Sequence, residues 1–400
     1  MKILVLCNKS PYPPKEGGPI AMNMIIEGLI AAGHQVKVLA VNSGKYNISP
    51  AEIPDIYRDK TGLELIDVDL RVKPLPAMIN LVMQRSYHVQ RFKSGRFRAR
   101  LTEILKTETF DVVQFEMLFM SVYLRTVRKY STAKTVLHSH NIEHLIWERI
   151  AATTRNPFRK VYLMHLARTL KTFELSVINR FDGLCTITAK DLKFFIDHGC
   201  IIPATDIPFG INPEYYEAGT NQPDNPISLF SIGAMNWIPN QEGIRWFLQN
   251  VWGDVQKQFP TLKYYIAGRE MPDWLIRSNY PNVEVVGEVE IAYDFMRSNG
   301  IMIVPLFSGS GIRIKIIEGM ALGKPIISTT IGAEGIGYTD GENIIIADQP
   351  CEFFEMISNC LQSQNFRDRI GTNAKKLVES NYNRSRIISK LLAFYQKIGV

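Results

Sequence analysis

Short apolar segments rich in β-branched residues alternate with amphipathic segments along almost the whole chain, and this alternation limits the fold more than any other feature. Such alternation is typical of parallel α/β sheets whose strands are joined by helices. In the first half we expect strands at Ile3–Cys7, Gln35–Val41, Val112–Phe115, Thr135–His138, Gly183–Ile187 and Thr205–Ile207. In the second half we expect them at Ser228–Gly233, Leu262–Gly268, Val283–Val286, Ile301–Pro305, Pro325–Thr329 and Asn343–Ala347.

The helical segments and one loop divide this pattern into two domains. Helices are expected at Ala21–Ala32, Gln241–Gln258, Ala292–Arg297, Arg313–Leu322, Cys351–Ser363, Asn365–Ser380 and Arg384–Lys397. A chain of 400 residues is too long for one ordinary core, and Pro213–Pro226, rich in Pro, Gly, Asn and Asp, reads as a linker. We therefore predict two doubly wound, Rossmann-like domains facing across a cleft, with ligands at the carboxyl ends of the strands. Their predicted limits are 1–207 and 227–380, joined by a linker at 208–226 and followed by a helical segment, 381–400, that crosses back onto the first domain.

Composition excludes several classes of protein. No apolar run approaches the roughly 20 residues that span a bilayer, and the apolar stretch Ile3–Leu6 is shorter than the core of a signal peptide. The five cysteines are scattered and form no CxxC pair, so we expect free thiols in a reducing cytoplasm. Residues 1–200 hold 29 Lys and Arg against 18 Asp and Glu, whereas residues 201–400 hold 17 against 21. The basic half is therefore expected to face an anionic partner, either nucleic acid or a membrane surface.

The segment PLFSGSGIRIKIIEGMALGKP, residues 305–325, combines a glycine loop with two cations at the start of a helix. The unpaired N–H groups of a helix start favour anions there and disfavour cations, so Arg313 and Lys315 stand at the unfavourable end. Glycines let the backbone approach a ligand closely, and a helix start offers its N–H groups to phosphate oxygens. Glu318, one turn further on, suits the hydroxyls of a ribose. The alternative is a Gly-Ser turn with Ser310 as N-cap and a surface Lys315–Glu318 pair, but this helix is apolar almost all round, so it should be buried.

This segment resembles the donor-binding segment of GT-B glycosyltransferases, specifically of the large retaining family 4. The resemblance covers the second half of the chain in the family's order, through GAMNWIPN at 233–240, IAGREMP at 266–272, VGEV at 286–289, GKPIIST at 323–329 and GAEG at 332–335. It implies that Arg313 and Lys315 hold the diphosphate of a nucleotide-sugar and that Glu318 holds its ribose. The remaining donor-binding residues that it implies are Gly233, Asn236, Gly268, Arg269, Val289, Ser310, Gly311 and Ile312.

In the first half, Lys15–Pro19 resembles the family's glycine loop, so Gly17 and Gly18 are expected near the donor phosphates. A plain strand-to-helix turn is the alternative. His140 stands at the carboxyl end of a strand, where a comparable family histidine contacts the transferred sugar, and an ordinary loop histidine is the alternative. His138, His140 and His144, with the carboxylate of Glu143, also invite a metal site, but His144 falls on the next element and this fold usually needs no metal. We therefore expect neither metal nor cofactor.

These features and the resemblance predict an enzyme that transfers a sugar from a UDP- or GDP-sugar to a glycan or lipid-linked acceptor. The resemblance further implies retention of configuration. We expect it to act in cell-surface polysaccharide or lipopolysaccharide biosynthesis, with Arg313, Lys315 and His140 as the catalytic residues. Many members have Glu where this chain has Ser310, which leaves the donor sugar and the chemistry open. Two alternatives are a nucleotide-sugar 2-epimerase of the same fold and a non-catalytic partner subunit that binds nucleotide-sugar.

Two basic clusters interleaved with aromatic residues lie in the first half. One contains Arg85, Tyr87, Arg91, Phe92, Lys93, Arg96, Phe97, Arg98 and Arg100, and the other contains Arg155, Phe158, Arg159, Lys160, Tyr162, Leu163, Arg168 and Lys171. Cations with aromatic residues suit an anionic membrane surface, and the alternative is a solvated charged face. No nucleic-acid-binding signature accompanies them. We expect a cytoplasmic protein without nucleic-acid partners that associates peripherally with the inner face of the cell membrane.

Overall fold

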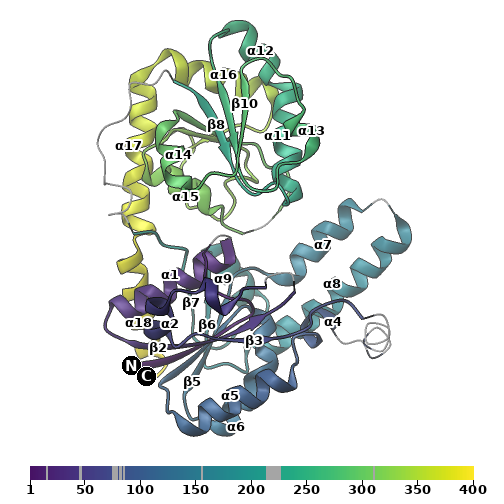
Figure 1. The fold of residues 1–400 in the computed structure, drawn as a ribbon, viewed down its shortest axis with the longest axis vertical. Coiled ribbons are helices and arrows are strands. Elements are labelled where there is room, and N and C mark those ends of the chain that lie inside the picture. The colour runs from purple at the N-terminus through teal and green to yellow at the C-terminus, as the bar shows by residue number, and fades with distance from the viewer. Residues whose placement is uncertain are drawn as a thin grey trace. The chain divides into compact units, whose positions relative to one another are not determined.

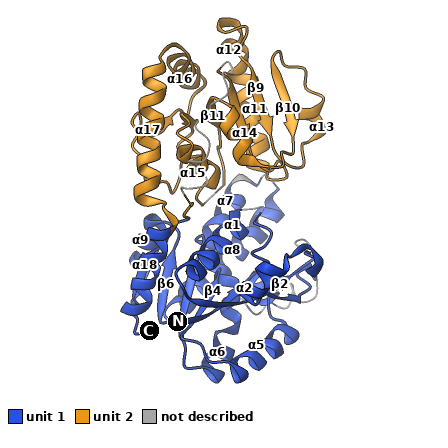
Figure 2. Cartoon of the chain, turned by 60° about the vertical axis from the view of Figure 1, so that its left-hand side comes forward, with its two compact units in different colours: residues 1–209, 385–400 blue, residues 210–384 orange. Residues whose placement is uncertain are grey.

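The computed structural model describes residues 1–14, 17–44, 47–73, 80, 83, 86–154, 156–212, 227–309 and 311–400. The chain divides into two compact units, which Figure 2 shows in different colours. Unit 1 comprises Met1–Phe209 and Ser385–Val400, and unit 2 comprises Gly210–Arg384. The predicted linker segment Pro213–Pro226 lies outside the described residues.

Unit 1 is built on a seven-stranded parallel sheet (Figure 1). Its strands are β1 (Lys2–Cys7), β2 (Gln35–Asn42), β3 (Glu64–Asp67), β4 (Val112–Glu116), β5 (Lys134–Ser139), β6 (Gly183–Thr186) and β7 (Ala204–Asp206). The spatial order is β3-β2-β1-β4-β5-β6-β7, so the direction of winding reverses between β1 and β4. Right-handed crossovers on either side of such a reversal place helices on opposite faces of the sheet. The prediction of a doubly wound unit is confirmed, although sequence analysis missed β3.

Helices α1 to α9 of unit 1 lie between these strands in the chain, and α18 returns to the unit after unit 2. They are α1 (Gly17–Ala31), α2 (Asp55–Thr61), α4 (Tyr87–Gln90), α5 (Gly95–Thr107), α6 (Leu124–Tyr130), α7 (Glu143–Thr153), α8 (Pro157–Ile178), α9 (Ala189–Asp197) and α18 (Arg384–Lys397, from Ser385 on). Two short 3-10 helices, η1 (Pro50–Glu52) and η2 (Leu118–Tyr123), complete it. Helices α7 and α8 form a hairpin, and Figure 1 shows it extending from the rest of the unit.

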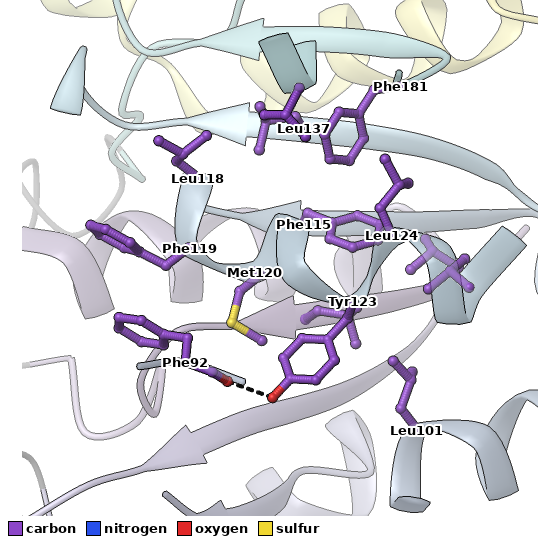
Figure 3. Close-up of a cluster of buried hydrophobic side chains, with 14 of the residues drawn as sticks. Phe92, Leu101, Phe115, Leu118, Phe119, Met120, Tyr123, Leu124, Leu137 and Phe181 are labelled. Atoms are coloured by element: carbon purple, nitrogen blue, oxygen red, sulfur yellow. Dashed lines mark hydrogen bonds between the residues drawn. The ribbon is translucent and has the colours of Figure 1, made fainter. Parts of the chain in front are cut away.

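Aromatic side chains fill the core of unit 1 between the sheet and its helices (Figure 3). Phe92 stacks on Phe119, and the Tyr123 hydroxyl donates a hydrogen bond of 2.6 Å to the Phe92 carbonyl. Phe97 is fully buried against Tyr123. The aromatic members Phe92 and Phe97 of the first basic cluster therefore belong to the core. Their expected contact with a membrane surface is wrong, because their side chains are removed from water by folding.

The last helix, α18, packs on the sheet of unit 1. Its Phe394 ring lies so close to β6 that a Cβ on Gly183 would come within 2.8 Å of it. Lys390 forms an ion pair of 2.8 Å with Asp206 at the end of β7. The hydroxyl of buried Tyr395 donates to the side-chain oxygen of Gln114 on β4. These contacts place the C-terminal residues in the same unit as the first strand.

Unit 2 is built on a six-stranded parallel sheet in the order β10-β9-β8-β11-β12-β13. The strands are β8 (Leu229–Ile232), β9 (Tyr264–Ala267), β10 (Val283–Gly287), β11 (Ile301–Val304), β12 (Ile326–Ser328) and β13 (Ile345–Ile346). The helices are α11 (Ile238–Asn250), α12 (Trp252–Gln258), α13 (Asp273–Ile276), α14 (Ala292–Ser298), α15 (Ile314–Ala321), α16 (Pro350–Gln362) and α17 (Gln364–Asn381). Winding reverses between β8 and β11.

The structure divides one expected helix of unit 2, at residues 241–258, into the two helices α11 and α12. The apolar pattern of Gln241–Gln258 predicted a single element, but Val251 takes a non-helical backbone with φ −123° and ψ −49° between α11 and α12. The break turns Trp252 into the core, where it is 1% exposed and its indole N–H donates to the Pro281 carbonyl. Burial of this large side chain offsets the helical hydrogen bonds that the break removes.

All five cysteines are free thiols, as expected. Within the part of the chain that the structure describes, no helix has the length and apolarity needed to cross a membrane.

Candidate functional site

Each sheet has one point where its winding reverses, and such points form ligand sites at the carboxyl ends of the strands. In unit 2 the point lies between β8 and β11, whose ends lead into the loop that begins at Gly233 and into the loop at 305–312. In unit 1 it lies between β1 and β4, next to β5. The candidate residues Gly233, Gly311 and Arg313 stand on these loops of unit 2 or directly after them, and His140 directly follows β5 in unit 1.

Arg313 immediately precedes α15 and lies against the glycine loop. Its side chain is 6% exposed, one terminal nitrogen donates a hydrogen bond of 2.6 Å to the Gly311 carbonyl, and its guanidinium carbon lies 5.1 Å from the ring centroid of Trp237. Gly309 has φ +106°, and a Cβ there would come within 2.7 Å of the Trp237 ring and 2.9 Å of the Arg313 guanidinium. The loop therefore needs glycine, because its backbone packs directly on these two side chains.

Lys315 lies within the first turn of α15 and reaches across to the end of β8. Its ammonium donates to the Ile232 carbonyl at 2.9 Å and to Asn240 Oδ1 at 3.0 Å. Burial and the charge of Arg313 lower the pKa of Lys315 to about 7. A Cβ on Gly233 would lie 3.2 Å from the Lys315 nitrogen. The absence of a side chain at this position therefore leaves room for the ammonium beside the β8 loop. An anion placed against it would favour the charged form and raise the pKa again.

The loops after β8, β9 and β10 are hydrogen-bonded side by side. The Gly233 amide donates to the Ala267 carbonyl at 3.1 Å, and the Gly268 amide donates to the Gly287 carbonyl at 2.7 Å. The β8 and β9 loops are joined again beyond these glycines, by the Met235 amide to the Arg269 carbonyl and by the Asn236 side chain to Glu270. Four predicted donor-binding residues, Gly233, Asn236, Gly268 and Arg269, therefore belong to one connected layer of loops.

For the other predicted donor-binding residues of unit 2, the structure gives the element on which each lies and how far it is buried. Ile312 lies in the glycine loop and Glu318 lies in the middle of α15, and both side chains are half-buried. Val289 follows β10 and is also half-buried. Ser310, where the sequence departs from the common family pattern, lies outside the described residues. The structure thus brings Arg313 and Lys315 together with the glycine loops, and it leaves the role of Ser310 a prediction.

In unit 1, Lys9 follows β1 and lies beside the predicted glycine loop at the start of α1. Its charge also acts on His140. Gly17 and Gly18 begin α1, and a Cβ on Gly18 would lie 3.0 Å from the Lys9 side chain. Burial lowers the pKa of His140 more than the charge of Lys9 does. Lys15 and Glu16, the first residues of the predicted loop, lie outside the described residues.

His140 is held by a buried carboxylate that sequence analysis missed. Glu116, the last residue of β4, is fully buried. Its Oε2 lies 2.6 Å from His140 Nε2 and 3.0 Å from His138 Nδ1. The Gln114 amide donates to Glu116 Oε1, and Tyr395 of α18 donates to Gln114. A chain of hydrogen bonds therefore runs from the C-terminal helix to the carboxyl end of β5.

The charge on Glu116 fixes the direction of these hydrogen bonds. Burial by itself would raise the pKa of Glu116, but the two histidines lower it well below its usual range. An ionised carboxylate only accepts hydrogen bonds, so His138 carries a proton on Nδ1 and His140 carries one on Nε2. Burial lowers the pKa of His140, which keeps this ring neutral near pH 7. His140 therefore offers Nδ1 as a hydrogen-bond acceptor.

Glu116, His138 and His140 also form a possible set of metal ligands. Their ligand atoms lie within 4.8 Å of one another, and two imidazoles with one carboxylate suit zinc. The donor set fits an ion in number and chemistry, although the carboxylate already accepts from both imidazoles and from Gln114. His144 stands apart, because its Nδ1 pairs with Glu174 at 2.5 Å. Sequence analysis set His144 apart from the other two histidines but missed Glu116, and the expectation that no metal takes part stays a prediction.

A second buried carboxyl group, Glu143, lies at the start of α7. Burial and the neighbouring charge of Glu174 raise the pKa of Glu143 to about 8, and the charge of Lys9 opposes this shift. Sequence analysis quoted Glu143 only as part of a metal motif. The signal for Glu116 was present too, since an acidic residue that ends a buried strand requires a buried polar partner.

The two basic clusters differ in exposure. In the first, Arg100 pairs with Glu64 at 2.5 Å and with Glu103 at 2.7 Å, which makes it part of an ion-pair network. The second lies on α8, where Phe158 is 86% and Val161 is 68% exposed beside exposed cations. Arg85 and Arg155 lie outside the described residues. Only the second cluster presents apolar side chains to solvent.

Comparisons with known proteins find glycosyltransferases among the proteins to which this chain is similar. Residues 226–363 match the family model described as "Glycosyl transferases group 1", and the described residues of this range belong to unit 2. Over 98% of both chains, the protein is 24% identical to an uncharacterized 44.6 kDa protein in the cps region of Klebsiella pneumoniae. It is also 24% identical to the capsular polysaccharide biosynthesis glycosyltransferase CapM of Staphylococcus aureus, over 42% of this chain and 46% of CapM.

The fold is that of the GT-B glycosyltransferases. The crystal structure of Anabaena HepE in complex with UDP superposes with a TM-score of 0.69 at 14% identity, covering 99% of this chain and 100% of HepE. The predicted fold class, two Rossmann-like units of the GT-B type, is thereby confirmed.

Proposed function

We propose that this chain is a glycosyltransferase that transfers a sugar from a UDP- or GDP-sugar to a glycan or lipid-linked acceptor in cell-surface polysaccharide or lipopolysaccharide biosynthesis. The observation that carries the proposal is the convergence of Arg313 and Lys315 on the glycine loops of unit 2. Two cations beside the start of a helix form a site for a diphosphate. The match of this unit to group 1 glycosyl transferases supports the assignment.

Departure of the nucleoside diphosphate is the costly step of such a reaction. Arg313 and Lys315 would stabilise the negative charge that develops on the diphosphate, a role like that of an oxyanion hole. Glu318, on the helix that follows the glycine loop, would bind the ribose hydroxyls. We propose retention of configuration, by attack on the same face of the sugar from which the diphosphate leaves.

His140 would contribute an acceptor to sugar recognition. With its Nε2 hydrogen directed to Glu116, its Nδ1 is available to a sugar hydroxyl, which must donate. This polarity favours a role in holding a substrate hydroxyl over a role as a cation.

The test is incubation of the purified protein with UDP- and GDP-sugars, followed by analysis of nucleotide and sugar. Release of free nucleoside diphosphate supports transfer or its hydrolytic side reaction, and Arg313→Ala should nearly abolish it. Arg277→Ala is the matched control, because Arg277 is an exposed arginine of the same unit. Full activity of the Arg313→Ala protein would contradict the assignment.

The same incubation separates the two alternatives. A 2-epimerase would return the nucleotide-sugar with an inverted sugar centre, and a partner subunit would bind it unchanged. None of the matches named above is described as an epimerase.

We also propose a cytoplasmic enzyme that contacts an anionic membrane surface through the start of α8. Phe158, Val161 and Met164 are 86%, 68% and 56% exposed, and Arg159 and Lys160 are exposed between them. Apolar side chains with adjacent cations bind anionic lipid surfaces. Sedimentation with phosphatidylglycerol vesicles should fall for Phe158→Asp and stay unchanged for Ile276→Asp, an equally apolar exposed residue of unit 2. Equal sedimentation of both variants would contradict the proposal.

A further inference from the structure

A second concave site lies in unit 1, between α4, the end of η2, the start of α6 and the C-terminal half of α8. Its lining includes four cationic residues, Lys93, Arg125, Arg128 and Arg180, and no acidic residue. None of the residues discussed above as donor- or sugar-binding lines it. Its chemistry therefore calls for a separate explanation.

Two of these cations, Arg125 and Arg180, make no ion pair or side-chain hydrogen bond with the described part of the chain, and a third, Arg128, makes only a long ion pair. Arg128 lies 3.7 Å from Asp182, whose same oxygen already accepts hydrogen bonds of 2.8 and 2.6 Å from Thr135. Arg125 and Arg180 are both exposed. Cations gathered in a concavity without acidic neighbours raise the local potential and attract anions.

Two buried hydroxyl groups give independent evidence for a ligand. Ser86 and Ser121 line the same concavity and are 3% and 5% exposed. Neither Oγ atom has a hydrogen-bond partner among the described residues. Ser86 precedes α4, yet its hydroxyl does not cap that helix. A buried hydroxyl without a partner is unfavourable, and a ligand oxygen would satisfy it.

We propose that this concavity, the basic pocket, binds a phosphate group, with Arg125, Arg128 and Arg180 contributing charge and Ser86 and Ser121 donating hydrogen bonds. Guanidinium groups bind phosphate through paired N–H donors, and hydroxyls donate to the remaining oxygens. Apolar Val122, Leu124 and Phe173 also line the pocket, so the group attached to the phosphate packs on a partly apolar wall. The same chemistry is offered by a lipid headgroup and by a free phosphorylated compound.

Calorimetric titration with inorganic pyrophosphate tests the pocket. The titration uses the Arg313→Ala protein, so that the cations of unit 2 do not dominate the signal. Adding Arg125→Ala and Arg180→Ala should weaken binding at least about tenfold, since each charge-assisted contact contributes strongly. Lys106→Ala with Lys129→Ala removes the same charge from exposed positions that do not line the pocket, and it should leave affinity within about twofold.

The hydroxyls allow a sharper control. Ser86→Ala with Ser121→Ala should weaken pyrophosphate binding while the melting temperature stays equal or rises, because the variant removes two unpartnered buried hydroxyls. A purely structural role would lower the melting temperature and leave affinity unchanged. Unchanged affinity in both pocket variants, or the same loss in the Lys106/Lys129 control, overturns the proposal.

Vesicle binding distinguishes the two sources of phosphate. If the ligand is a lipid headgroup, Arg125→Ala with Arg180→Ala lowers sedimentation with phosphatidylglycerol vesicles, and pyrophosphate competes. If it is a free phosphorylated compound, the variant loses pyrophosphate binding and keeps vesicle binding. The pocket does not involve the nucleotide site, so absence of nucleotide binding would reject the proposed function and leave this result unaffected.

Discussion

Nucleotide affinity should depend on pH through Lys315. The ammonium group has a pKa of about 7 because burial and Arg313 disfavour its charge. A bound diphosphate favours that charge, so binding raises the pKa and takes up a proton. Affinity should therefore be fully present below pH 7 and fall as the pH rises towards the pKa of the complex.

The size of the effect follows from the fraction of protonated Lys315. With a pKa of about 7 the group is about half protonated at pH 7 and about 1% protonated at pH 9, so affinity should fall up to about 50-fold, or about 2.3 kcal/mol. The range from pH 7 to 9 is chosen because the terminal phosphate, with a pKa of about 6, stays ionised throughout.

Isothermal titration of UDP and GDP at pH 7, 8 and 9 measures this dependence. Repetition in buffers of different ionisation enthalpy counts the protons taken up. Lys315→Met should bind more weakly at pH 7 and lose the slope, because it keeps the aliphatic stem and removes the titrating group. Wild-type affinity that is constant between pH 7 and 9, or a Lys315→Met protein with the same slope, would refute the reasoning. Absence of binding at every pH would instead reject the nucleotide site.

Three further predictions concern the residues that support the candidate sites. Glu116→Gln should release the Nε2–H tautomer of His140, which ¹⁵N NMR of the imidazole rings detects, and a spectrum like that of the wild type would show that Glu116 does not set it. Gly309→Ala should weaken nucleotide binding about tenfold or more, since its Cβ would displace Trp237 or Arg313; Gly337→Ala, where no atom lies within 4 Å, is the control. Tyr395→Phe should lower the free energy of unfolding by about 1–3 kcal/mol, measured with urea, because it removes the donor to buried Gln114; unchanged stability would show that this hydrogen bond is not needed.

The pattern of the sequence predicted much of unit 2 because the relevant interactions are local. Strand boundaries agree to within a few residues for β8, β9, β10, β11 and β12. In β11 and β12 the apolar residues are consecutive and buried, as expected for strands buried on both faces. The cations of the motif also stand where the sequence placed them, with Arg313 directly before α15 and Lys315 in its first turn.

Interactions between distant residues were not predictable in the same way. Val251 breaks a helix that its local pattern favours, because Trp252 gains burial in the core. Phe92 and Phe97 were taken for surface residues, since an aromatic residue next to cations has the same local pattern on a surface and at the edge of a core. The tertiary fold decided both outcomes.

The sequence by itself determined the fold class and named the residues of the proposed nucleotide site, because periodicity and motif spacing are written along the chain. Tertiary structure decided which side chains meet. Glu116 and His140 are 24 positions apart, and Gln114 and Tyr395 are 281 apart. Parallel strands bring such residues to the same edge of a sheet, so their protonation and hydrogen bonding depend on neighbours that no local pattern contains.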